Sequence, residues 1–146
     1  MAALPQSGSA QAAGPFAGYD GQWQGTGRVV GTNGNAERIK CRATYKVSPD
    51  GSGLGQTLTC ASDSYRFDIR SDVVSDGRSV HGSWQELTRD ATGNLTGRIN
   101  DGTVESSVDG PGFTARLTVK MSGRKQVVTI NPTGTDITRV DITLTH

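Results

Sequence analysis

The chain has 146 residues, a length that suits one domain and allows a sizeable buried core. Its formal net charge of +1 provides no global field that would draw it to nucleic acid or to an anionic membrane. No apolar run approaches the roughly 18 residues that a transmembrane helix needs. The 20 glycines and the aromatic content of only 5% favour many short strands joined by tight turns, and they argue against helices.

The first residues differ in character from the rest of the chain. Residues 1–18 are rich in Ala, Gly, Ser, Gln and Pro and show no periodicity, so we expect a flexible N-terminal tail. The remaining residues, 19–146, are expected to form a single β domain. The extreme start has neither the basic region nor the apolar core of a signal peptide.

Strict alternation of polar and apolar residues dominates the chain after the tail. Residues 38–47, 65–70 and 113–121 alternate without an error, which is typical of antiparallel strands with one buried and one wet face. Turn signals such as Asp50-Gly51 and Gly93-Asn94 separate about ten such runs. Because closure removes unpaired strand edges, we predict an up-and-down antiparallel barrel of about ten strands. The alternative is a two-sheet β-sandwich.

The two cysteines, Cys41 and Cys60, fall within one predicted hairpin. If it folds about Asp50-Gly51, the numbers of paired residues sum to 101, and Cys41 faces Cys60 on the buried side within disulfide reach. A disulfide favours a periplasmic or secreted protein whose signal peptide has already been removed. The alternative is a cytosolic protein with two buried thiols.

The first predicted strand carries a family resemblance. Residues 21–27 read GQWQGTG. This G-x-W-x-G-x-G pattern resembles the first strand of calycin-type barrels, which include lipocalins, avidins and fatty-acid-binding proteins, and is most similar to the nitrobindin type of ten-stranded barrel. The resemblance implies that Trp23 plugs one end of the barrel, often beneath an arginine from a late strand. Arg139 is the candidate, although the alternation around it places it outside unless a bulge intervenes.

Catalytic and metal-binding residues are scarce. The chain has two histidines, of which His81 has outward parity and His146 is the last residue. A nucleophile with its base, or a zinc site, would need inward-facing histidines or further ligands. Haem capture of the nitrobindin kind would need an inward histidine on a late strand, and none fits. We therefore expect no enzymatic activity, no metal and no cofactor.

Inward parity instead places several polar and aromatic side chains in the interior of the barrel. Glu86 is the only acidic residue that we place inside the barrel, so it must be paired, protonated or solvated. About ten strands leave an interior wider than side chains alone fill, and small inward residues such as Gly25 and Gly82 allow close coiling. The predicted lining of a small-ligand pocket comprises Trp23, Tyr45, Gln56, Tyr65, Trp84, Glu86 and Gln126. The alternative is a satisfied internal network, or a Glu86 that meets water at the rim.

Three function hypotheses follow from this reading. The first is an exported calycin-like binding protein that holds a small, partly apolar ligand in the barrel lumen. The second is a barrel that acts on another macromolecule through its loops, as small exported protease inhibitors do, and the third is an envelope protein without a ligand. A basic stripe over Arg28, Arg38, Lys40, Arg42 and Lys46 lacks interleaved aromatics. We interpret it as a solvated face that blocks edge aggregation, so we expect no nucleic-acid partner.

Overall fold

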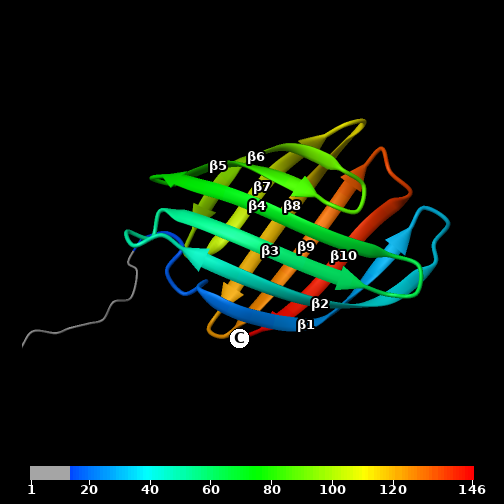
Figure 1. Ribbon diagram of the computed structural model, residues 1–146, viewed down its shortest axis with the longest axis horizontal. Coiled ribbons are helices and arrows are strands. Elements are labelled where there is room, and N and C mark those ends of the chain that lie inside the picture. The colour runs from blue at the N-terminus through cyan, green and yellow to red at the C-terminus, as the bar shows by residue number, and fades with distance from the viewer. Residues whose placement is uncertain (1–13) are drawn as a thin grey trace, which may run out of the picture.

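The computed structural model describes residues 14–146, which form ten antiparallel strands. Each strand pairs with its neighbours in sequence, and β1 also pairs with β10, so the sheet closes into an up-and-down barrel (Figure 1). The strands are β1 Gly21–Gly31, β2 Ala36–Val47, β3 Gly53–Ala61, β4 Arg66–Asp76, β5 Ser79–Glu86, β6 Ala91–Asn100, β7 Thr103–Gly110, β8 Phe113–Ser122, β9 Lys125–Thr133 and β10 Ile137–Thr145. The predicted barrel is confirmed, and the sandwich alternative is excluded.

The turns between strands gather at two ends of the barrel. The end that holds the start of β1 also holds the turns 48–52, 77–78, 101–102 and 123–124, and we call it the Trp23 end. The opposite end holds the turns 32–35, 62–65, 87–90, 111–112 and 134–136, and we call it the Trp84 end. No helix within residues 14–146 is long and apolar enough to cross a membrane.

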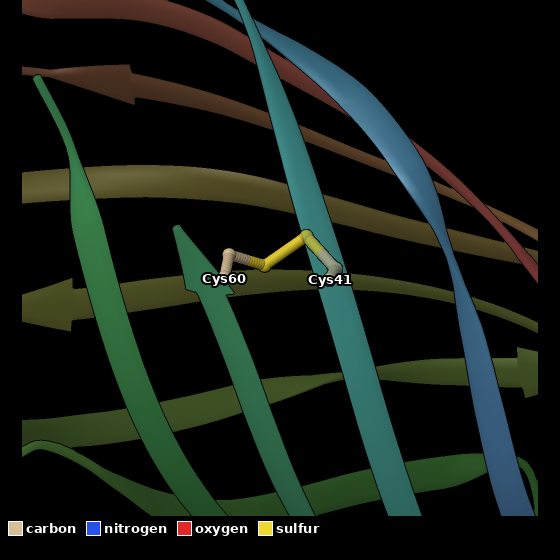
Figure 2. The surroundings of a disulfide bond; sticks show 2 residues. All are labelled: Cys41 and Cys60. Atoms are coloured by element: carbon tan, nitrogen blue, oxygen red, sulfur yellow. A yellow bond between two sulfur atoms is a disulfide. The ribbon is translucent and has the colours of Figure 1, made fainter. Parts of the chain in front are cut away.

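The hairpin of β2 and β3 has the predicted register. Cys41 lies opposite Cys60 and Val47 lies opposite Leu54, so paired numbers sum to 101. The two cysteines form a disulfide with a Cα–Cα distance of 4.1 Å, and both are buried. Figure 2 shows the bond joining the neighbouring strands β2 and β3.

Glycines let neighbouring strands approach closely where the sheet curves. A β-carbon on Gly25 or Gly27 of β1 would collide with backbone atoms of β10, and one on Gly82 would collide with the backbone of β4. These inward positions are therefore restricted to glycine by the backbone itself, as the closed barrel requires. The turn signal at Gly93-Asn94 is wrong, because both residues lie inside β6 and the turn falls at 87–90.

The N-terminal boundary predicted at residue 18 is too late. Phe16 is buried, and its backbone N–H donates to the carbonyl of Gly51 at 3.0 Å. The composition of this segment predicted a flexible tail, but Phe16 is ordered because burying its ring against the barrel removes apolar area from water. Residues 1–13 of the expected tail lie outside the described residues.

Candidate functional site

Four aromatic residues, which we call the plug, fill the barrel at the Trp23 end. Phe16, Tyr19, Trp23 and Tyr45 are all at most 3% exposed, and their edge-to-face contacts have centroid distances of 5.5–6.3 Å. Trp23 donates its indole N–H to the carbonyl of Tyr19 at 2.9 Å. Tyr19 in turn donates its hydroxyl to the carbonyl of Gly102 at 2.8 Å, which ties the plug to the turn between β6 and β7. Burial raises the pKa of Tyr19.

The partner of Trp23 differs from the one that the resemblance implied. Arg139 points outward, because the bulge in β10 does not turn this side chain inward. Its guanidinium binds the carboxylate of Asp141 at 2.7 Å. The ring of His146 instead lies 4.8 Å from the Trp23 ring, between centroids. Trp23 is thus buried as predicted, but without a cation from a late strand.

A chain of polar side chains starts in the middle of the barrel and runs into the plug. Ser71 donates its hydroxyl to the amide oxygen of Gln56 at 2.8 Å, and the Gln56 amide nitrogen donates to the Tyr45 hydroxyl at 3.2 Å. Tyr45 then donates to the amide oxygen of Gln126 at 2.9 Å. Desolvation by burial raises the pKa of Tyr45 to about 12, so the phenol stays protonated. Gln126 is fully buried, and its amide nitrogen has no partner within residues 14–146.

Toward the Trp84 end the inner wall of the barrel is apolar and only partly buried. Strand alternation turns these side chains inward, yet each keeps an intermediate exposure to solvent. We call this set the lumen lining: Phe67, Ile69, Trp84, Val108, Phe113, Leu117 and Ile130. Buried rings therefore fill most of the inner face at the Trp23 end, where Met121 is also partly exposed, whereas solvent reaches the lumen lining at the Trp84 end.

Within this lining, the Trp84 ring lies along the wall over two glycines. A β-carbon on Gly93 of β6 or on Gly110 of β7 would lie 2.7 Å from atoms of the indole. The indole N–H donates to the carbonyl of Asp109 at 3.1 Å, and Phe113 contacts the ring at a centroid distance of 5.7 Å. The two glycines and the hydrogen bond fix the orientation of a large, partly exposed aromatic surface.

A second aromatic pair lies where β4 begins, at the same end. Tyr65 and Phe67 stack with centroids 6.2 Å apart and an interplanar angle of 12°. The guanidinium of Arg89 lies 5.1 Å from the centroid of the Phe67 ring, within cation–π range. The rim at the Trp84 end thus combines aromatic surface with a cation.

Glu86 faces inward as predicted, but its carboxylate serves the adjoining turn. It is 6% exposed and accepts hydrogen bonds from the backbone N–H groups of Asp68, Thr88 and Arg89. The Thr88 hydroxyl and the Arg89 guanidinium also donate to it, at 2.6 and 3.2 Å. Burial alone would raise the pKa of Glu86, but these hydrogen bonds outweigh it and lower the pKa. Glu86 therefore belongs to a satisfied structural network.

The seven predicted lining residues divide into separate groups. Trp23, Tyr45 and Gln126 lie at the end that holds the plug, whereas Tyr65, Trp84 and Glu86 lie at the other. Gln56 connects them, since its β4 partner Ser71 lies directly opposite Trp84. Sequence reasoning left out the apolar lining residues, although the parity that selected Trp84 also points them inward.

The histidines and carboxylates of the described residues do not form a metal site. His81 is exposed on the outer face, as its parity predicted. Within residues 14–146, no group of three or more His, Cys, Asp and Glu side chains is placed to hold a metal ion.

Comparisons with known proteins bear on the fold. No family model and no curated protein matches the sequence. Among solved structures, the barrel is similar to the S-type phycobiliprotein lyase CPES from Guillardia theta, with a TM-score of 0.63 over 87% of each chain. The two sequences are 9% identical, so the likeness concerns the fold.

Proposed function

We propose that this barrel binds a small, partly apolar ligand in its lumen, entering at the Trp84 end. The observation that carries the proposal is the asymmetry of the inner face. One end is filled by buried rings, whereas the other exposes inward-facing apolar side chains to solvent. A ligand that covers exposed apolar surface on a concave inner wall removes it from water, which favours binding.

The lining also indicates what the ligand offers. A flat body would cover the free side of the Trp84 ring, whose other side lies on Gly93 and Gly110. Ser71 lies directly opposite Trp84 on the neighbouring strand, and Gln56 lies opposite Ser71 on the next strand; both polar side chains are partly exposed. The Ser71 oxygen keeps a lone pair for a ligand donor, so a single polar group on the ligand would fix its orientation.

Two further observations support parts of this proposal. A barrel of similar fold is a phycobiliprotein lyase, and at 9% identity only the fold is carried over. The disulfide between Cys41 and Cys60 supports function in an oxidising compartment, periplasmic or extracellular, where such bonds persist.

The test compares two adjacent positions of β7 that face opposite ways. Val108→Phe adds volume to the lumen lining, whereas Ser107→Phe adds the same ring on the exposed outer face. We expect the environment-sensitive probe N-phenyl-1-naphthylamine to bind the unmodified protein and the Ser107 variant, with binding weakened about tenfold in the Val108 variant.

Native mass spectrometry of the freshly isolated protein extends the test to the natural ligand. A retained small molecule that Val108→Phe excludes and Ser107→Phe keeps would support lumen binding. Lumen binding would be ruled out if both variants bound the probe equally well. It would also be ruled out if the unmodified protein did not bind the probe. A barrel that acts through its loops, or one without a ligand, would then be the better account.

A further inference from the structure

The outer face of four neighbouring strands has a marked excess of positive charge. On β1, β2, β3 and β10, the outward side chains include six cations and one carboxylate, Asp141, a net charge of +5. The formal charge of the entire chain is only +1. We call these six residues the basic face: Arg28, Arg38, Lys40, Arg42, Lys46 and Arg139.

Protection of a strand edge, expected from the sequence, does not account for this charge. The barrel is closed, so β1 and β2 have no free edge to protect. Arg28 lies opposite Arg38 in the β1–β2 ladder and opposite Asp141 in the β1–β10 ladder, so one cross-strand neighbour repels it and the other attracts it. Within residues 14–146, the ion pairs of the barrel are Arg89–Glu86 and Arg139–Asp141, so five cations of the basic face have no carboxylate in contact.

The cations of β2 form a line. Arg38, Lys40 and Arg42 occupy successive outward positions, and all three are exposed. Outward side chains on one strand repeat about every 7 Å, so these charges are regularly spaced along the barrel surface. Lys46 extends the line beyond Thr44. Such an array matches a linear ligand with repeating negative charges.

A polar groove of about 510 Å³ adjoins this line on the outer surface. The strand β3 presents only Gly, Thr and Ala outward, so its small side chains form a low floor beside the cations of β2. The groove is lined mostly by polar residues, with Trp23 and Ala43 among them: Gln22, Trp23, Gln24, Arg42, Ala43, Thr44, Thr57, Thr59, Thr145 and His146. Amide and hydroxyl groups of this kind donate and accept hydrogen bonds, which suits a ligand rich in hydroxyl groups.

We propose that this face binds an acidic polysaccharide, with its carboxylates on the β2 cations and its hydroxyl groups against the groove. Nucleic acid fits less well, because no aromatic side chain lies outward on these strands to stack with bases. A membrane surface fits less well too. The exposed large apolar residues are Val74 and Leu87, which lie away from the basic face on β4 and the turn 87–90.

The test uses oligogalacturonate as the acidic glycan, dextran as the neutral one and a dT12 oligonucleotide as an unrelated polyanion, all measured by calorimetry at several salt concentrations. We expect the unmodified protein to bind oligogalacturonate, with an affinity that falls as salt rises. Dextran should not bind measurably, and dT12 should bind more weakly than oligogalacturonate. Equal binding of dextran would overturn the charge argument, and tighter binding of dT12 would overturn the polysaccharide assignment.

Two matched triple variants locate the site. Arg38→Gln/Lys40→Gln/Arg42→Gln should weaken oligogalacturonate binding about tenfold and flatten its salt dependence, since several exposed contacts are lost. The control Arg116→Gln/Lys120→Gln/Lys125→Gln removes the same charge from exposed positions on β8 and β9. It should change binding less than about twofold. Equal losses in both variants would mean that net charge alone acts, which would overturn the proposal.

The groove is tested separately from the charge. Thr57→Trp fills the groove without changing any charge, so it should weaken oligogalacturonate binding and leave the salt dependence unchanged. Unaltered binding by the Thr57 variant would remove the groove from the proposal and overturn it. Thermal unfolding of each variant checks that the barrel is intact. Because the basic face lies outside the barrel, none of these variants should alter probe binding in the lumen.

Discussion

Gly93 of β6 lies so close beneath the Trp84 ring of β5 that a β-carbon on the glycine would sit 2.7 Å from two indole atoms. The same β-carbon would collide with the carbonyl of Asp109 on β7. Glycine at position 93 therefore allows β6 and β7 to approach closely and also leaves room for the indole ring. This explains why a glycine followed by asparagine, a usual turn signal, lies within a strand here.

The first prediction uses the second glycine beneath the ring. The three atoms nearest to a methyl group on Gly110 would all be side-chain atoms of Trp84 and Phe113, which can move. Gly110→Ala should therefore shift the Trp84 fluorescence and cost about 1–3 kcal/mol of unfolding free energy. Gly93→Ala should cost more, because backbone must also move. Gly55→Ala is the control, since its β-carbon has only ordinary contacts, and a fluorescence shift there would contradict the explanation.

The second prediction concerns the disulfide. It closes a loop with a sequence separation of 19, so replacing Cys41 and Cys60 by alanine should lower the unfolding free energy by about 3 kcal/mol. Reductant should destabilise the unmodified protein by a similar amount and leave the double variant unchanged. Denaturant titration measures both. Insensitivity of the unmodified protein to reductant would show that the bond is not formed.

Local pairing was the most predictable part of the fold. A turn centred on Asp50-Gly51, together with strict alternation, determines which residues face each other, and this predicts Cys41 opposite Cys60 correctly. Barrel closure followed because ten consecutive strands, joined by nine hairpins, leave two edges that can pair. Such features depend on neighbours in the sequence.

The surroundings of individual side chains were less predictable. Parity gave the inward direction of Glu86, but its partners come from a turn whose conformation the sequence pattern did not reveal. The docking of Phe16 and the seating of Trp84 on glycines likewise depend on segments brought together only by the closed barrel. Period-two alternation carries no information on such contacts.

The third prediction concerns Glu86 and pH. Its pKa is lowered from the usual 4.5 in the folded protein, so its ionised form stabilises the fold above the unfolded pKa, and that contribution is lost as pH falls through the folded pKa. Glu86→Gln should cost about 1–3 kcal/mol at neutral pH, because several donors lose a charged acceptor.

Denaturant titrations between about pH 7 and 3 check this assignment. The difference in unfolding free energy between the unmodified protein and Glu86→Gln should shrink as the pH decreases. Asp50→Asn is the control for a change at a distant carboxylate. Asp50 also has a lowered pKa, about 2, but it lies in the exposed turn at the other end of the barrel. A variant with unchanged stability and weakened probe binding would instead place Glu86 in the ligand site.

The last prediction separates the two tryptophans. Trp23 is 2% exposed within the plug, so Trp23→Ala should lower the unfolding free energy by about 3–5 kcal/mol, as truncation of a buried aromatic does. Trp84 is partly exposed and lies on glycines rather than within the core, so Trp84→Ala should cost only about 1 kcal/mol. Its loss should instead weaken N-phenyl-1-naphthylamine binding about tenfold, the value of one aromatic contact.

Trp84→Phe supplies the control for that assignment, because it retains an aromatic surface over the glycines while losing the hydrogen bond to the Asp109 carbonyl. It should restore most of the probe affinity that the alanine variant loses. If both Trp84 variants bind the probe as the unmodified protein does, the ring does not contact the ligand. If Trp84→Ala destabilises the protein as strongly as Trp23→Ala, the ring serves the core, and the asymmetry between a filled and an accessible end no longer supports a ligand site there.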